Sequence, residues 1–206
     1  MFKKAVISIT ILVSFLLAFP LSSQESIEDK YSEIKPALPT QTGDKIEVIE
    51  IFWYGCPHCY SFEPFLEAWL KTLPDDVEFI RLPGVLNQAW IPHAKAYYTA
   101  EKLDIVEKIH RPFFDAIHKQ KQPLNTEQQI MAFFVGHGVT AEDFNRVYNS
   151  KEIDTKIRQA YFAARDYKIT GVPSVVVNGK YLTSGTISGT FDSMLNIIDQ
   201  LIEKER

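Results

Sequence analysis

The two cysteines of the chain are the residues whose types and spacing point most directly to chemistry. Cys56 and Cys59 are separated by Pro57 and His58, and the 206 residues contain no third cysteine. A disulfide that closes so short a loop restrains the unfolded chain very little, so the pair is poorly suited to a structural role. Two thiols at this spacing are instead typical of thiol–disulfide exchange.

The cysteine pair lies where a predicted strand gives way to a predicted helix. The first turn of a helix presents unpaired backbone N–H groups and the positive end of the helix dipole, which would stabilise a thiolate at Cys56. Pro57 suits this turn because its missing N–H is not needed there. A charged His58 would attract the thiolate further. We therefore expect a lowered pKa at Cys56, and a buried, less ionised thiol at Cys59.

The expected pKa difference sets the direction of the reaction. A thiolate stabilised in the reduced protein makes the disulfide a stronger oxidant, by about 1.4 kcal/mol for each pKa unit. A thiol of low pKa is also the better leaving group. A substrate thiolate should therefore attack Cys56 and form a mixed disulfide, which the second substrate thiol resolves. The redox group is then the Cys56–Cys59 disulfide itself, and no other cofactor is expected.

Other uses of the cysteine pair fit the sequence less well. A structural zinc site needs four ligands, usually from two such pairs, and the chain has only one pair. Covalent haem attachment requires a histidine directly after the second cysteine, whereas Tyr60 follows Cys59. No metal site is therefore predicted, and a metal carrier remains only an alternative.

The first 23 residues have the order of a secretory signal peptide. Lys3 and Lys4 precede an apolar run over residues 5–19, and Pro20 and small polar residues follow. The run is shorter than the roughly 20 residues that a membrane-spanning helix needs. We expect cleavage and export rather than stable membrane insertion, with an uncleaved anchor as the alternative.

The charge of the remaining chain excludes one class of partner. The signal segment holds two of the 22 basic residues and none of the 26 acidic ones, so the rest carries a net charge of −6 with histidine neutral. Such a chain has no basic surface for nucleic acid. Its length suits one hydrophobic core, or a core with an inserted subdomain.

The elements that position the cysteines follow from apolar periodicity. A nearly continuous apolar stretch predicts a central strand before the cysteines, and a helical stripe follows them. The Asn178-Gly179 pair is a strong hairpin signal. The predicted order is strand 45–54, helix 56–73, strand 77–82, four or five helices within 88–167, strand 174–177, strand 180–183 and helix 190–202.

This order of elements and motifs resembles the DsbA family of periplasmic thiol:disulfide interchange proteins. The most specific segments are FWYGCPHCYSFEP at 52–64, NQAW at 87–90 and GVPSVVVNGKY at 171–181. The resemblance implies an α/β chain with a thioredoxin fold, in which a central mixed β-sheet is interrupted by an inserted all-helical domain. The implied division is a signal peptide at 1–23, a lead-in at 24–44, the thioredoxin fold at 45–86 and 168–206, and the helical insertion at 87–167.

The resemblance also implies partners and further site residues. The substrates would be unfolded or reduced exported proteins in the periplasm, and a DsbB-like membrane quinone reductase would reoxidise the protein, which is expected to be a monomer. Pro173 would be cis beside the disulfide, and Val172 would offer backbone hydrogen bonds to a substrate. Glu50 and Arg81, on faces of neighbouring predicted strands, would lie beneath the cysteines, where Glu50 would help to move the proton of Cys59.

Alternatives to this function stay open from the sequence alone. One is a periplasmic disulfide reductase or isomerase, although only about 22 residues separate the predicted signal peptide from the first strand, too few for the dimerisation domain of the familiar isomerases. Another is a non-catalytic metal or peptide binder. For Glu50, a structural ion pair or an exposed edge position is the alternative. The histidines outside the cysteine motif are expected in surface or helix-capping roles: His93, His110, His118 and His137.

Overall fold

The computed structural model describes residues 27–206, so the predicted signal peptide lies outside the described residues. The centre of the fold is a five-stranded sheet in the order β1-β5-β4-β2-β3. Only the β2–β3 pair is parallel and the other pairs are antiparallel, so the sheet is mixed, as predicted. The strands are β1 (Ser32–Glu33), β2 (Ile46–Phe52), β3 (Val77–Pro83), β4 (Ser174–Val177) and β5 (Tyr181–Ser184).

Strand β2 is the central element because it pairs with β3 on one side and β4 on the other. All seven of its residues are buried, which explains the nearly continuous apolar sequence. The strand is shorter than the predicted range of 45–54, since the chain turns at Tyr54 and Gly55 before it enters the first helix.

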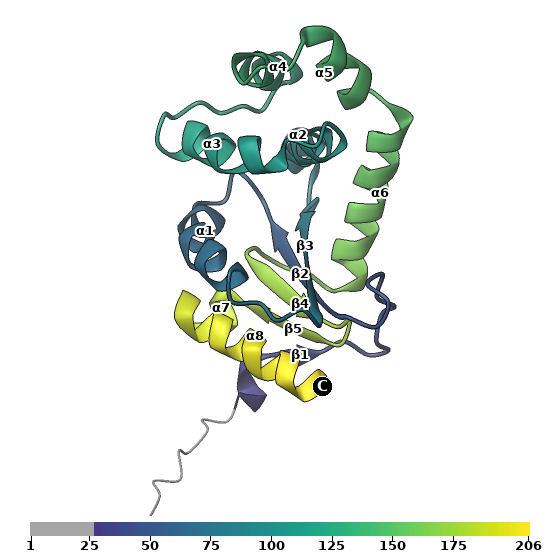
Figure 1. Ribbon diagram of the computed structural model, residues 1–206, viewed down its shortest axis with the longest axis vertical. Coiled ribbons are helices and arrows are strands. Elements are labelled where there is room, and N and C mark those ends of the chain that lie inside the picture. The colour runs from purple at the N-terminus through teal and green to yellow at the C-terminus, as the bar shows by residue number, and fades with distance from the viewer. Residues whose placement is uncertain (1–26) are drawn as a thin grey trace, which may run out of the picture.

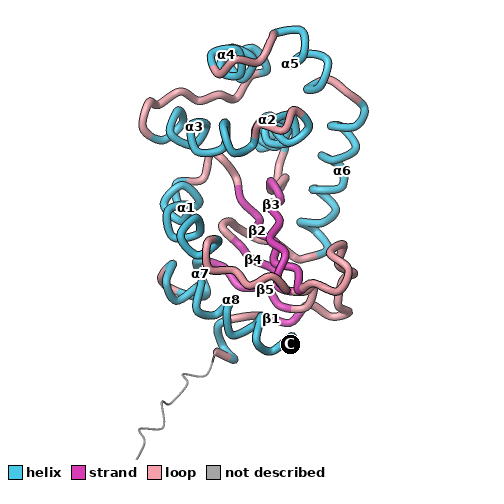
Figure 2. Tube along the Cα trace, viewed as in Figure 1, coloured by secondary structure: helices cyan, strands magenta, loops and turns pink. Residues whose placement is uncertain are grey.

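The helices form two groups around the sheet (Figures 1 and 2). Helices α1 and α8 lie beside the strands, while α2 to α5 form a layer at one end of the sheet and α6 runs back from that layer. Helices α2 to α6 all lie between β3 and β4 in the chain, in agreement with the predicted block of four or five helices. The helices are α1 (Pro57–Leu70), α2 (Ile91–Lys102), α3 (Val106–His118), α4 (Glu127–Gly136), α5 (Ala141–Tyr148), α6 (Lys151–Asp166), α7 (Gly185–Ser188) and α8 (Phe191–Glu205), with 3₁₀ turns at Glu28–Lys30 and Gln88–Trp90.

The predicted hairpin joins β4 and β5. Asn178 and Gly179 have φ angles of 49° and 64°, the left-handed conformation that this turn requires. The returning strand begins at Tyr181 rather than at Lys180, because Lys180 still belongs to the turn and its N–H bonds to Val177 O at 3.0 Å.

The lead-in before β2 packs against the edge of the sheet. Its short strand β1 pairs with β5 at the edge of the sheet. The Leu38 N–H also donates to Gly179 O at 3.0 Å, so the lead-in packs against the hairpin. This packing was not predictable, since a two-residue strand depends on its partner and not on its own sequence.

One hydrophobic cluster joins the sheet to the helical layer. It contains Phe52, Tyr54 and both cysteines together with buried residues of α2 to α6. The cysteine pair therefore lies where the helices of the layer pack on the end of the central strand. Within residues 27–206, no helix combines the length and the apolar character needed to cross a bilayer.

Candidate active site

Cys56 is the N-cap residue of α1, at the end of the turn that leaves β2. Its backbone is extended, with φ −84° and ψ 119°, and its Sγ accepts the Cys59 N–H at 3.5 Å. Pro57 occupies the first turn, as expected. Both thiols are free, and Cys56 is 7% exposed whereas Cys59 is fully buried. Only one of the two sulfurs is therefore within reach of another molecule.

The surroundings shift the pKa values of the two thiols in opposite directions. A hydrogen bond from the Cys59 thiol, with smaller contributions from the N–H groups of Cys59 and His58 and from the His58 charge, lowers the pKa of Cys56 to about 6 against the opposing effect of burial. Burial is the largest cause that raises the pKa of Cys59 well above its usual value. Cys56 is thus the group that ionises near neutral pH.

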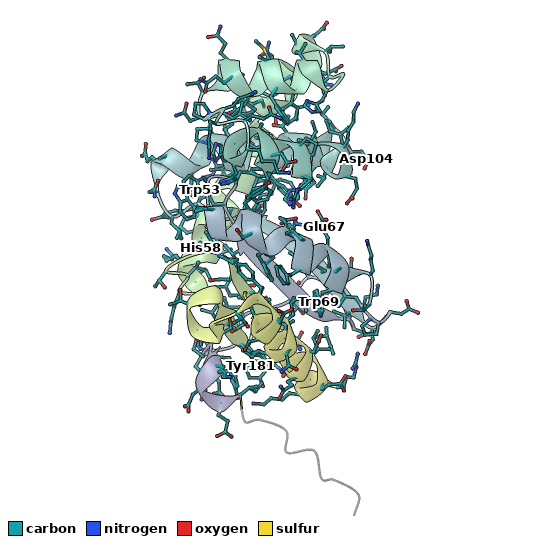
Figure 3. All side chains as sticks on the ribbon, turned by 90° about the vertical axis from the view of Figure 1, so that its left-hand side faces the viewer. Trp53, His58, Glu67, Trp69, Asp104 and Tyr181 are labelled. Carbon is teal, nitrogen blue, oxygen red and sulfur yellow. The ribbon has the colours of Figure 1, made fainter. Side chains whose placement is uncertain are left out.

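A cleft opens beside Val172, whose carbonyl oxygen lies 3.3 Å from Cys56 Sγ. It encloses about 650 Å³ and is lined by His58, Phe65, Pro173, Ile187 and Phe191, among others. Phe65 and Ile187 are large apolar side chains exposed to solvent. Figure 3 shows His58 at the surface near the start of α1. The arrangement can hold an extended chain with apolar side chains next to the reactive sulfur.

The loop before β4 forms the other wall at the sulfur. The Val172–Pro173 peptide bond is cis, as the resemblance implied. Cys56 Sγ lies within hydrogen-bonding distance of Val172 O, at 3.3 Å. The structure therefore brings together Cys56, Cys59, His58 and the Val172-Pro173 dipeptide, although the last two are more than a hundred residues away along the chain.

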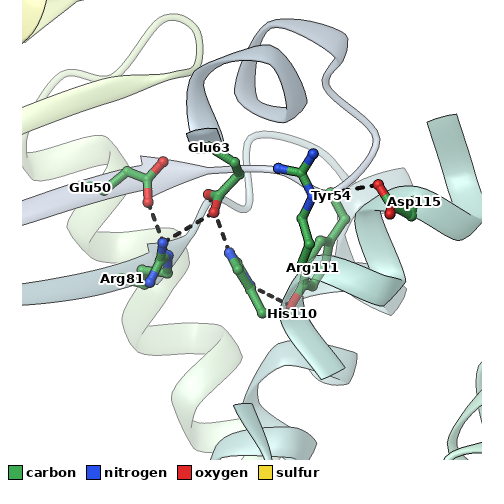
Figure 4. Close-up of polar contacts among 7 residues, drawn as sticks. All are labelled: Glu50, Tyr54, Glu63, Arg81, His110, Arg111 and Asp115. Carbon is green, nitrogen blue, oxygen red and sulfur yellow. Dashed lines mark hydrogen bonds and ion pairs between the residues drawn. The ribbon is translucent and has the colours of Figure 1, made fainter. Parts of the chain in front are cut away.

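Glu50 lies in a buried cluster with a second acid that sequence reasoning missed (Figure 4). Parallel pairing of β2 and β3 places Glu50 opposite Arg81, and Arg81 Nε lies 3.3 Å from Glu50 Oε2. Arg81 Nη2 also donates to Glu63 Oε2 at 3.1 Å. Glu50 and Glu63 are both fully buried, which excludes an exposed edge position for Glu50.

The cluster continues into the helical layer through a histidine. His110 Nε2 lies 3.2 Å from Glu63 Oε1, and His110 Nδ1 lies 2.9 Å from the Tyr54 hydroxyl. His110 and His93 are both buried, so the prediction of surface or capping roles was wrong for these two. His93 lies among the buried residues of α2, and His110 lies among those of α3. No local signal in the sequence marks either histidine as buried.

Burial and pairing shift the pKa values of the two acids in opposite directions. Burial, reinforced by the charge of Glu63, raises the pKa of Glu50 to about 8 against the attraction of Arg81. Glu63 is also penalised by burial, but its close contact with His110 and the positive charges of Arg81 and Arg111 hold its pKa below the usual value. The Glu50 charge in turn contributes to the raised pKa of Cys59.

A second set of contacts fastens α3 to the active-site turn. His118 Nε2 lies 2.8 Å from Tyr54 O, and its ring stacks on Tyr60 with centroids 4.7 Å apart. The Tyr60 hydroxyl donates to Asp115 Oδ1 at 2.8 Å. The turn that carries Cys56 is therefore held by side chains of α3 as well as by the sheet.

The comparisons with known proteins point to one family. The DSBA-like thioredoxin domain matches residues 80–195. Thiol:disulfide interchange protein DsbA of Pseudomonas syringae pv. tomato is 36% identical over 206 residues, covering 99% of this chain and 96% of that protein. The chain belongs to the DsbA family.

Solved structures of DsbA proteins agree with this assignment. The crystal structure of Pseudomonas aeruginosa DsbA superposes with a TM-score of 0.83 at 41% identity, covering 86% of this chain and 93% of that one. DsbA from Xylella fastidiosa gives a TM-score of 0.80 at 34% identity, over 86% and 95% of the two chains. The fold is thus the thioredoxin-like fold of DsbA, and the chain is a protein disulfide oxidoreductase.

The redox group of the DsbA family is a disulfide of the protein itself. In the part of the chain that the structure describes, no group of three or more histidine, cysteine or acidic side chains could hold a metal ion.

Proposed function

We propose that the protein donates a Cys56–Cys59 disulfide to reduced cysteines of exported proteins. The observation that carries this proposal is the asymmetry of the two thiols: Cys56 reaches the surface and has a pKa of about 6, while Cys59 is buried and its pKa is raised. Each pKa unit of thiolate stabilisation is worth about 1.4 kcal/mol, or about 30 mV in a two-electron couple. The DsbA family is itself a standard example of this tendency, so the direction agrees with the family.

The reaction proceeds in two exchange steps. A substrate thiolate attacks Cys56 Sγ, the Cys56–Cys59 bond breaks, and the electron pair leaves on Cys59. Cys59 then takes up a proton. The second substrate thiolate attacks the substrate sulfur of the mixed disulfide, and Cys56 leaves as a thiolate. The substrate loses two electrons and the protein gains them.

Glu50 is the proposed source of the proton for Cys59. A buried thiolate is costly, so Cys59 must be protonated as it leaves. A carboxyl with a pKa of about 8 still holds a proton at neutral pH, and the charge that it carries once it has lost this proton raises the pKa of Cys59. Proton transfer from Glu50 would leave a carboxylate beside Arg81, whose positive charge stabilises it.

The cleft beside Cys56 is the proposed substrate site. The backbone of Val172 and the cis Pro173 would receive an extended peptide, and His58 at the rim would favour the Cys56 thiolate. The apolar lining suits segments that are buried only after a substrate has folded. Residues 87–167 would form a helical domain that covers the other side of the site.

The proposed setting is the periplasm, after cleavage of a signal peptide at residues 1–23. There the protein, as a monomer, would be reoxidised by a DsbB-like membrane quinone reductase. Related proteins that carry the name thiol:disulfide interchange protein DsbA support this setting.

The redox potential of the cysteine couple tests the proposed direction. Equilibration with glutathione should give a value near the oxidising end of the known range, about −120 mV, where DsbA itself lies. A value near the thioredoxin end, about −270 mV, would instead assign the protein as a reductase.

Trapping of the mixed disulfide tests the roles of the two sulfurs. A Cys59→Ala variant should retain a disulfide-linked peptide on Cys56 after reaction with an activated peptide disulfide, while Cys56→Ala should retain none. Equal labelling of the two variants would refute the assignment of Cys56 as the attacked sulfur.

A further inference from the structure

The buried cluster holds two acids for one arginine. Glu50 on β2 and Glu63 on α1 are fully buried, and the Arg81 side chain between them is 12% exposed (Figure 4). Ionisation of both acids would leave an uncompensated negative charge in the interior, which is costly. One of the two carboxyls must therefore hold a proton in the neutral range.

The contacts of the two acids are unequal. Glu63 accepts an aligned hydrogen bond at Oε2 from Arg81 Nη2, and its Oε1 lies 3.2 Å from His110 Nε2, close but without an aligned hydrogen bond. Glu50 has only the 3.3 Å ion pair with Arg81 Nε, and neither of its oxygens has an aligned hydrogen bond. Donors stabilise the charged form of a carboxyl, so the negative charge belongs on Glu63.

The contact of His110 with Tyr54 fixes which ring nitrogen carries the proton. The buried Tyr54 hydroxyl keeps its own proton, because burial raises its pKa well above the usual value. Among the described residues, His110 Nδ1, 2.9 Å away, is the one hydrogen-bond partner of this hydroxyl, so the hydroxyl proton is satisfied only if it is donated to Nδ1. A neutral ring that accepts at Nδ1 carries its proton on Nε2, which faces Glu63. Burial lowers the pKa of His110, which keeps the ring neutral.

We propose that His110 is a positioning residue of the redox site, which keeps Glu63 as the charged carboxylate of the cluster and so leaves the proton on Glu50. The proposal rests on the proposed role of Glu50 as the proton source for Cys59 and extends it into the helical layer. A residue of α3 that touches neither cysteine thereby decides which acid of the sheet can deliver a proton.

Other groups also act on the cluster. Arg111 makes the smallest of the contributions that lower the pKa of Glu63, and it is partly exposed and also paired with Asp115 at 3.5 Å. The remaining titratable groups that act on members of the cluster are Glu67 of α1, Tyr97 of α2 and Cys59.

The tautomer of His110 tests the proposal in the unmodified, reduced protein. Nitrogen-15 NMR of the imidazole should show Nε2 protonated and Nδ1 unprotonated between pH 5 and 9. The opposite tautomer would overturn the proposal, because Nε2 would then have no proton to donate to Glu63. This measurement needs no variant and so does not depend on the folding of one.

Carboxyl titrations in three proteins test the effect on the acids. With carbon-13 labelled glutamate, Glu50 should titrate above neutral pH in the unmodified protein while Glu63 stays ionised. His110→Leu should lower the proton affinity of Glu50 by about tenfold or more, equivalent to one pKa unit, and bring Glu63 into the neutral range. His110→Gln, whose amide can still donate to Glu63, should restore the original order. Unchanged titrations in His110→Leu would overturn the proposal.

The outcomes separate this proposal from the proposed function. If Glu50 is not the proton source, Glu50→Gln will leave the oxidation rate unchanged, while the titrations still follow His110. If His110 does not set the proton distribution, the titrations will be insensitive to it, while Glu50→Gln still slows oxidation.

Discussion

Cys56 Sγ lies 3.3 Å from the carbonyl oxygen of Val172, a residue 116 positions later in the chain. The protonated thiol donates to this oxygen, and the thiolate has no proton to donate. The same sulfur accepts the Cys59 N–H at the start of α1. Ionisation of Cys56 therefore exchanges a contact with the cis-proline loop for stronger contacts with the helix, and frees the Val172 carbonyl for a substrate.

The Val172 carbonyl should consequently report the ionisation of Cys56. In the reduced protein, its carbon-13 shift should titrate with a midpoint near pH 6, the pKa of Cys56. Cys56→Ser, whose hydroxyl keeps its proton, should show no such transition over pH 4–8. A titration that persists in Cys56→Ser would mean that another group controls the loop.

The redox potential should change its pH dependence near pH 6. Each proton taken up on two-electron reduction contributes about 30 mV per pH unit. Below pH 6 the reduced protein binds protons on both sulfurs, so the slope should be about −59 mV per unit. Above pH 6 only Cys59, whose pKa is raised, binds one, and the slope should fall to about −30 mV per unit. Measurements against glutathione from pH 4.5 to 8 check this, and a single slope throughout would contradict the lowered pKa of Cys56.

Glu50→Gln should slow the oxidation of a dithiol by about tenfold or more at pH 7, because general acid catalysis typically contributes at least that much. The proton-donating form of Glu50 is present below its pKa of about 8 and lost above it. The rate of the unmodified protein, corrected for the thiolate fraction of the dithiol, should therefore decline above about pH 8, and the variant should lack this decline. Stopped-flow tryptophan fluorescence gives both rates.

Glu47→Gln is the matched control for that experiment. Glu47 is a buried acid of the same strand, but it points to the other face and accepts the Gln41 N–H at 2.8 Å. Its amide variant should oxidise the dithiol at the original rate. Equal losses in the two variants would indicate a general effect on the strand and not proton transfer.

The sequence predicted the parts of the site that local rules determine. A strand that ends at a glycine, followed by a proline in the first helical turn, predicted Cys56 at the start of a helix. The alternation of side chains on two neighbouring predicted strands singled out Glu50 and Arg81 as candidates. Their contact, however, depends on the parallel register of β2 and β3. That register is a property of the assembled sheet.

The parts that the sequence did not predict depend on contacts between distant elements. Glu63 lies between the buried Phe62 and Leu66 of α1. The apolar pattern of this helix predicted a buried face, but it did not show that Glu63 belongs to that face. His110 meets Glu63 only because α3 packs over the end of the sheet. A carboxylate on the apolar face of a predicted helix is the one signal that would have drawn attention to this cluster.

Replacement of Arg81 should destabilise the protein in a pH-dependent way. Arg81→Met leaves two buried acids without a positive partner, which typically costs about 3–5 kcal/mol. Both folded pKa values then lie above the unfolded ones, so the stability is highest at acid pH and is lost as the pH rises through 5 to 8. Urea unfolding should therefore show a larger deficit at pH 8 than at pH 5. Arg81→Lys keeps the positive charge and should lose less free energy of unfolding than Arg81→Met at both pH values. If the loss in Arg81→Met does not depend on pH, the buried acids are not its cause.

Gly55 is required because Trp53 occupies the space of its missing side chain. A Cβ at Gly55 would lie 2.3–2.6 Å from three ring carbons of Trp53, which stacks on Trp90 with centroids 4.5 Å apart and planes 2° apart. The Gly55 backbone is not in the left-handed region, so the obstacle to alanine is the contact with the Trp53 ring and not the backbone conformation. Gly55→Ala should therefore cost about 1–3 kcal/mol through overpacking and alter the near-ultraviolet circular dichroism of the stacked rings.

A double-mutant cycle separates this steric cause from a backbone effect. In a Trp53→Ala background the ring is absent, so the same Gly55→Ala change should cost little, and the coupling between the two sites should reach about 1–2 kcal/mol. Urea unfolding of the four proteins gives the coupling directly. If Gly55→Ala costs as much without the ring as with it, glycine is needed for the backbone of the turn, and the Trp53 contact does not explain it.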